Sequence, residues 1–135
     1  MEGGDMGVAP EVDKTLGDFV SEFNSGDSTA IAALFASTDD VLGIGTDPKE
    51  WWRGRATLMR VLEAQMKEMS GARLDISEKA GAGSWVAAQC SIGMPGGPAT
   101  PARLTIVCTG DGLIEHFHLS VGAANEDVIG QTLTT

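Results

Sequence analysis

The chain has 135 residues, 42% of them hydrophobic, and carries a formal net charge of −10 at pH 7 from 19 acidic and 9 basic residues. These values predict a single globular domain and argue against nucleic acid or an anionic membrane as a partner. No apolar run reaches the length of a bilayer span, and the N-terminus lacks the basic and apolar regions of a secretion signal. We therefore expect a cytoplasmic protein.

Two helices are predicted after a Gly-rich stretch, residues 1–10, that we expect to be flexible. The first helix has an apolar stripe at helical spacing: Val12, Leu16, Phe19, Val20 and Phe23. Asn24-Ser25-Gly26 ends it, because glycine favours the left-handed conformation found at helix C-termini. Asp27 or Ser28 can then cap a shorter helix that contains Ile31, Leu34 and Phe35.

A short strand is predicted for residues 41–45, and its two glycines suggest a bulge or the close approach of another backbone. The sequence Asp47-Pro48-Lys49-Glu50 has the pattern of a helix N-terminus, with Asp47 as the capping residue. A third helix is predicted for residues 55–69. One face of it carries Leu58, Val61, Leu62, Gln65, Met66 and Met69.

From residue 72 onward the hydrophobic period changes to two, which predicts strands near residues 73–79, 85–92, 102–109 and 113–122. The turns between them are short, and Asp111-Gly112 is a strong hairpin signal. Consecutive strands joined by short turns pair antiparallel. Helices followed by such strands predict an α+β fold.

Alternation sorts the strand residues into two opposite faces. One face is wholly apolar: Val86, Ala88, Cys90, Ile92, Leu104, Ile106, Cys108, Phe117, Leu119 and Val121. The other is mixed: Trp85, Ala87, Gln89, Ser91, Arg103, Thr105, Val107, Thr109, His116, His118 and Ser120. The apolar face packs on the helices in the simplest arrangement. The pattern leaves open which face lines a cavity, because bulges can exchange faces along a strand.

Three residues are candidates for acid/base chemistry. His116 and His118 point the same way on one strand, about 7 Å apart, which suits a proton carrier, two metal ligands or a structural pair. A metal needs a third ligand, and no other histidine exists, so no metal site is expected. Asp47 is either a general base at a pocket mouth or the helix cap described above.

Trp51 and Trp52 are adjacent, so their side chains project in different directions, one into the core and one toward a cavity or an interface. Arg103 lies on the mixed face with the histidines. No phosphate-binding loop, dinucleotide fingerprint or nucleophile elbow is present, and no cofactor is expected. The chain has no tyrosine. Cys90 and Cys108 lie in separate apolar strands and are expected to be buried free thiols.

Residues 44–54 (IGTDPKEWWRG), the amphipathic helix after them and residues 116–127 (HFHLSVGAANED) resemble the SnoaL-like branch of the nuclear transport factor 2-like superfamily. The resemblance covers a domain at residues 11–130 and leaves residues 131–135 as a tail. It implies a cone-shaped α+β fold, with three N-terminal helices packed in a strongly curved antiparallel sheet. An internal pocket and a homodimer formed through the sheet are also implied.

Superfamily members include ketosteroid isomerases, polyketide cyclases, epoxide hydrolases and non-catalytic binding domains, so the resemblance leaves three hypotheses. The first is a domain that binds a small apolar or aromatic molecule through Trp51, Trp52, Arg103 and His116. The second is an isomerase or cyclase, in which Asp47 is the nearby match to the family's base and His118 is its acid/base partner. The third is a dimeric interaction or sensing module.

Overall fold

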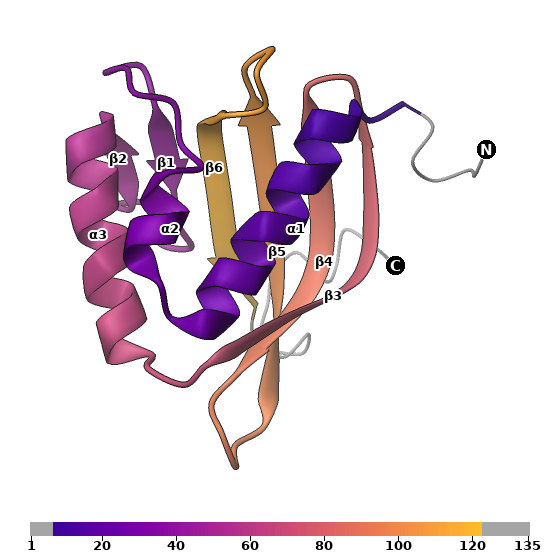
Figure 1. The fold of residues 1–135 in the computed structure, drawn as a ribbon. Helices are drawn as coiled ribbons and strands as arrows, with labels where there is room; N and C mark the ends of the chain where they lie inside the picture. The colour runs from indigo at the N-terminus through magenta and orange to yellow at the C-terminus, as the bar shows by residue number, and fades with distance from the viewer. Residues whose placement is uncertain (1–6, 123–135) are drawn as a thin grey trace.

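The computed structural model describes residues 7–122, in which helices precede most of the strands (Figure 1). The order is α1 (Pro10–Ser25), α2 (Ser28–Ala32), β1 (Leu42–Ile44), β2 (Trp51–Arg53), α3 (Arg55–Glu68), β3 (Arg73–Ala82), β4 (Trp85–Gly93), β5 (Ala99–Cys108) and β6 (Ile114–Val121). The predicted α+β class and the three helices are confirmed. The expected tail at residues 131–135 and the end of the 116–127 segment lie outside the described residues.

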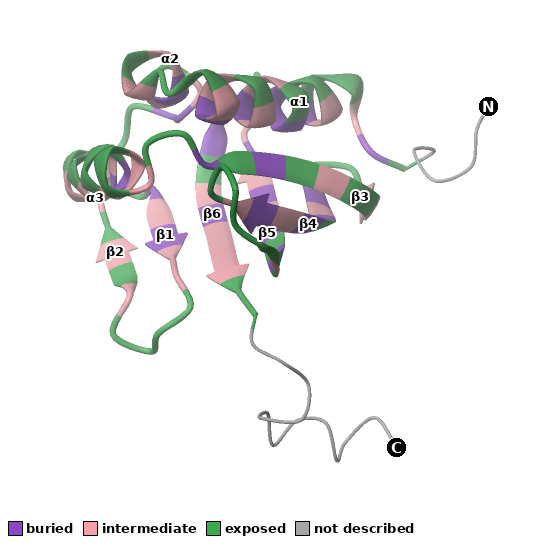
Figure 2. Ribbon diagram, turned by 90° about the horizontal axis from the view of Figure 1, so that it is seen from below, coloured by how far each residue is buried: buried purple, intermediate pink, exposed green. Residues whose placement is uncertain are grey.

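The strands form one curved, open sheet in the order β2-β1-β6-β5-β4-β3. Four of the five pairs are antiparallel, as expected, but β1 pairs parallel with β6, which makes the sheet mixed. The long connection through α3 and β3–β5 returns the chain beside β1 in the same direction, as parallel pairs require. Figure 2 shows α1 and α2 over the buried side of the sheet, with α3 beside β1 and β2.

The segment from Asp47 to Glu50 is a reverse turn between β1 and β2, and the expected helix start at this position is wrong. The Glu50 amide donates to the Asp47 carbonyl at 2.8 Å, and the Asp47 amide donates to the Glu50 carboxylate at 2.9 Å. These bonds occur equally at a helix N-terminus, so the local pattern does not distinguish the two structures. The chain then enters β2, a strand that the sequence analysis missed.

The apolar face of the sheet packs on the helices and forms the core. Val86, Leu104, Ile106 and Phe117 are at most 1% exposed. The ring of Phe117 lies 5.2 Å from that of Phe19 on α1, centroid to centroid. The mixed face is therefore the outer, convex face of the sheet. Alternation alone left open which face lines a cavity, and the structure shows that the apolar face is turned toward the helices.

Both cysteines are free and buried in this core, as expected. Burial, together with the negative charge of Glu115, raises the pKa of the Cys108 thiol to about 11. Burial also raises the pKa of Cys90. Neither thiol is therefore an activated nucleophile at neutral pH.

Candidate functional site

A cavity of about 560 Å³ lies between α3, the β1–β2 hairpin and the ends of β4 and β6. Its apolar lining comes from Ile44, Pro48, Trp52, Met69, Ile92, Phe117, Leu119 and Val121. Its polar lining comes from Thr46, Asp47, Glu50, Gln65 and Glu68, with Gly45 completing the wall. The volume falls within the usual range for small-molecule sites, roughly 300–1,000 Å³, and the mixture of an apolar wall and a few polar groups is typical of them.

The two adjacent tryptophans lie on opposite faces because consecutive residues of a strand alternate. Trp52 pairs in register with Gly43 and lines the cavity, whereas Trp51 is 55% exposed on the outer face. Gly45 makes room for this arrangement, since a Cβ at that position would come within 2.8 Å of the Trp52 ring. The two glycines of the first strand, Gly43 and Gly45, therefore leave room for neighbouring side chains rather than for another backbone.

The mouth of the cavity is acidic. Asp47, Glu50 and Glu68 contribute carboxylates, and among the described residues no Lys, Arg or His lines the cavity. Thr46 accepts a hydrogen bond from the Val121 amide at 2.7 Å, which ties the hairpin to the end of β6 and closes one side of the cavity. The field at the mouth therefore favours a cation or a neutral hydrogen-bond donor over an anion.

His116 and His118 do not face this cavity. Phe117 and Leu119 line it, so the residues that alternate with them point to the outer face. There His116 pairs in register with Val107 and Leu42. Burial lowers the pKa of His116, and the neighbouring His118 lowers it further.

The structure thus does not assemble the acid/base pair that the sequence analysis suggested. Asp47 lies at the cavity and His118 on the opposite face of the sheet. Arg103 pairs in register with Gln89 and Ser120 on that outer face, away from the cavity. Of the predicted ligand contacts, Trp52 lines the cavity, while Trp51, Arg103 and His116 do not.

Several lining residues were missed by the sequence analysis. Gln65 and Glu68 lie in the last turns of α3, and Met69 follows its end. The polar residue Gln65 on an otherwise apolar helix face could have indicated these lining positions. A polar side chain in a filled core costs free energy unless it is hydrogen-bonded, so a cavity explains its presence better. Leu119 and Val121 extend the apolar alternation of β6 beyond the core, which was a second signal.

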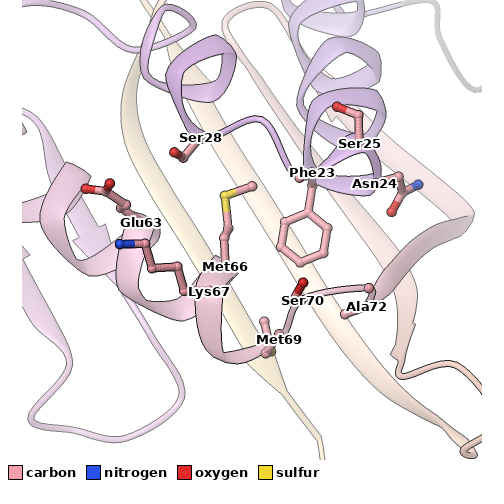
Figure 3. A pocket seen from close by; sticks show the side chains of 12 residues that line it. Phe23, Asn24, Ser25, Ser28, Glu63, Met66, Lys67, Met69, Ser70 and Ala72 are labelled. Carbon is pink, nitrogen blue, oxygen red and sulfur yellow. The ribbon is translucent and has the colours of Figure 1, made fainter.

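A separate hollow of about 430 Å³ lies between the C-terminal ends of α1 and α3. Figure 3 shows Phe23 and Met66 within it and Glu63 and Lys67 along α3. Asn24 also lines this hollow, and its side-chain amide makes two hydrogen bonds with the backbone of Leu74. None of the residues that the sequence analysis singled out as site candidates lines this hollow, so the cavity beside Trp52 is the candidate site.

The described residues contain no group of three His, Cys, Asp or Glu side chains placed to hold a metal ion. In residues 7–122 no helix has the length and hydropathy needed to cross a membrane.

Solved structures with the same fold include the following three. A nuclear transport factor 2-like protein of unknown function from Mesorhizobium loti has a TM-score of 0.70 and 19% identity, with 87% of this chain and 100% of that chain covered. A candidate ketosteroid isomerase from Kribbella flavida has a TM-score of 0.69 and 18% identity, covering 84% and 79%. An epoxide hydrolase/cyclase-like enzyme with a role in pyran ring formation in the polyether salinomycin has a TM-score of 0.70 and 16% identity, covering 83% and 91%.

At these identities the structural likeness establishes the fold alone. A comparison with curated protein sequences found no match. The family model of the SnoaL-like domain matches residues 12–124, a range that includes all the strands and α3 and nearly all of α1. The chain therefore belongs to the SnoaL-like domain family and has the nuclear transport factor 2-like fold.

Proposed function

We propose that this protein binds a small apolar or aromatic molecule in the cavity beside Trp52. The observation that carries the proposal is a cavity whose largely apolar lining includes Trp52 and Phe117, together with a few polar groups. Burial of apolar surface supplies most of the affinity in such a site, and the few polar groups orient the ligand. An indole ring also offers a flat surface on which an aromatic ligand stacks.

Titration with N-phenyl-1-naphthylamine, a neutral fluorescent aromatic probe, tests this proposal. We expect saturable binding that Trp52→Ala weakens at least tenfold. Trp51→Ala is the matched control, because it removes the same side chain from the adjacent position on the other face of the sheet. Equal effects of the two substitutions, or the absence of saturable binding by the folded wild-type protein, would contradict the proposal.

A second candidate function is catalysis of the isomerase or cyclase type. It is favoured by the carboxylates of Asp47 and Glu50 at the cavity, because a positioned carboxylate can move a proton next to a carbonyl group. Similar structures described as a candidate ketosteroid isomerase and a cyclase-like enzyme are compatible with it. The chain has no tyrosine to stabilise an oxyanion, so a rate gain would have to come from the base and from positioning.

Isomerisation of a β,γ-unsaturated cyclic ketone, followed by the absorbance of its conjugated product, tests for this activity. If Asp47 is the base, Asp47→Asn will abolish turnover and leave probe binding unchanged. His118→Gln is the control, because that residue lies on the other face of the sheet. A wild-type rate equal to that of buffer would remove this reaction as a candidate.

We also propose that the outer face of the sheet forms a homodimer. Two exposed tryptophans, Trp51 and Trp85, lie on this face, and Val107 pairs in register with Trp85. Large exposed aromatic side chains on a sheet face are typical of an interaction surface, and a two-fold interface uses one surface twice. Sedimentation equilibrium should give twice the monomer mass for the wild type and for Trp85→Phe, and the monomer mass for Trp85→Glu. A monomeric wild type at micromolar concentration would contradict this.

A further inference from the structure

A second hollow continues from the candidate site beneath the turn between β4 and β5. Its volume is about 310 Å³, and it shares Met69, Ile92 and Val121 with the main cavity. Ala72, Met94 and Pro98 add further apolar surface, and in the described part of the chain no charged residue lines it. The two spaces therefore adjoin along three common side chains, and the second is the more apolar of the two.

Met69 stands at the boundary between these spaces. It immediately follows the last residue of α3 as its C-cap and is only partly buried. Methionine is unbranched, and rotation about its side-chain bonds changes the shape of a boundary at little cost. The other two shared residues, Ile92 and Val121, lie on β4 and β6 and form the floor on the sheet side. Among the three shared residues, Met69 has the most flexible side chain, so its conformation most readily changes the width of this boundary.

The charged residues of the combined space all line the main cavity. Asp47 and Glu50 come from the turn between β1 and β2, and Glu68 is the last residue of α3, next to Met69, while the second hollow contains only Thr100 as a polar side chain. A negatively charged group in the main cavity would meet three like charges. The main cavity is therefore acidic, whereas the second hollow is apolar.

We infer that the two spaces form one elongated site for a molecule with a long apolar body and a polar end that is not anionic. The polar end lies among the carboxylates beside Trp52, and the apolar body passes Met69 toward Pro98. An amine gains most from this field, an alcohol is accepted, and a carboxylate is repelled. This inference rests on the proposed binding function and adds the shape and charge class of the ligand.

Displacement of bound N-phenyl-1-naphthylamine by four competitors tests both properties on the full chain. Decylamine and butylamine differ in length, while decylamine, 1-decanol and decanoate share a chain and differ in the polar end. We expect decylamine to displace the probe at a concentration at least tenfold below that of butylamine and at least tenfold below that of decanoate. 1-Decanol should fall between decylamine and decanoate.

Met69→Phe tests the role of the boundary residue. We expect it to reduce the advantage of decylamine over butylamine at least fivefold. Both competitors are measured against the same probe on the same variant, so this ratio tests the boundary even though Met69 also lines the main cavity. Met66→Phe is the matched control, because Met66 lies in the last turn of α3, three residues before Met69, and lines neither space. If Met69→Phe fails to fold, Val121→Trp makes the same test from the sheet side, at a residue that is 39% exposed.

The outcomes separate this inference from the proposed function. Trp52-dependent binding of the probe without a preference for long chains would overturn the elongated site and leave the proposed function in place. Equal or tighter binding of decanoate would overturn the charge class. Absence of saturable probe binding would overturn the inference together with the function on which it rests.

Discussion

The indole ring of Trp52 lies over Gly45, so closely that a Cβ at Gly45 would come within 2.8 Å of the ring carbon Cη2 and of the Glu50 Cβ. A contact of that length is not sustained in folded proteins, and the ring must move if Gly45 acquires a side chain. The absence of a side chain at Gly45 thus leaves the room that the Trp52 ring occupies at the wall of the cavity.

The first prediction follows from this contact. Gly45→Ala will displace the Trp52 ring and Glu50, and the affinity for N-phenyl-1-naphthylamine will fall roughly fivefold, which corresponds to about 1 kcal/mol. Titration of the variant and the wild type measures the change. An unchanged affinity would mean that the ring position is not part of the site.

A second prediction compares two glycines that differ in their surroundings. A Cβ at Gly43 would collide with the fully buried side chain of Leu58, whereas a Cβ at Gly17 on α1 would meet nothing within 4 Å. Gly43→Ala should therefore lower the free energy of unfolding by about 1–3 kcal/mol. Gly17→Ala should raise it by about 0.5–1 kcal/mol, because alanine restricts the unfolded chain and favours the helix. Urea unfolding measures both changes. A Gly43→Ala variant as stable as the wild type would contradict the predicted collision with Leu58.

A third prediction concerns Asn24, whose side-chain amide pairs with both backbone polar groups of Leu74. The Leu74 amide donates to Oδ1 at 2.7 Å, and Nδ2 donates to the Leu74 carbonyl at 2.9 Å. Asn24→Ala removes both of these hydrogen bonds, so the free energy of unfolding should fall by about 1–3 kcal/mol. Asn24→Asp keeps the acceptor but not the donor and should be less stable than the wild type. Equal stability of all three proteins in urea would show that the pairing contributes nothing.

A fourth prediction concerns pH and follows from the lowered pKa of His116, which burial causes first and His118 second. The folded protein binds this proton less readily than the unfolded chain, whose histidine titrates near the ordinary value of about 6.5. The stability contributed by the neutral imidazole is therefore complete above that value and is lost as the pH falls through the folded-state pKa. His116→Gln should reduce the loss of stability between pH 7.5 and pH 5.5, as measured by urea unfolding at both pH values. If the variant loses as much stability between these two pH values as the wild type does, other titrating groups cause the loss.

The fold class followed from the sequence because it depends on local hydrophobic periods. Leu16 and Phe19 belong to an apolar stripe at helical spacing, and Leu104 and Ile106 belong to an alternating apolar pattern. Each pattern predicts one buried face from a short stretch of sequence alone, and these residues are buried. The parallel pairing of β1 with β6 joins residues about 70 positions apart, such as Leu42 and His116. No local pattern contains that information.

The candidate site was less predictable for two physical reasons. The hydrogen bonds that Asp47 and Glu50 make are common to a helix start and a reverse turn, so the strand that carries Trp52 was hidden. The alternation on β6 separated His118 from Phe117 but did not say which of them faces a cavity, because that depends on where α3 lies. The sequence did single out Asp47 and Trp52, and both line the cavity.

The most direct test of the account uses the three tryptophan side chains as reporters, because one lines the cavity and two lie on the outer face. The ¹H–¹⁵N spectrum of the protein resolves an indole signal for each, and single substitutions to phenylalanine assign them. On addition of N-phenyl-1-naphthylamine, we predict that the Trp52 signal shifts and saturates while those of Trp51 and Trp85 stay in place. A shift confined to Trp51 or Trp85 would place binding on the outer face and contradict the account.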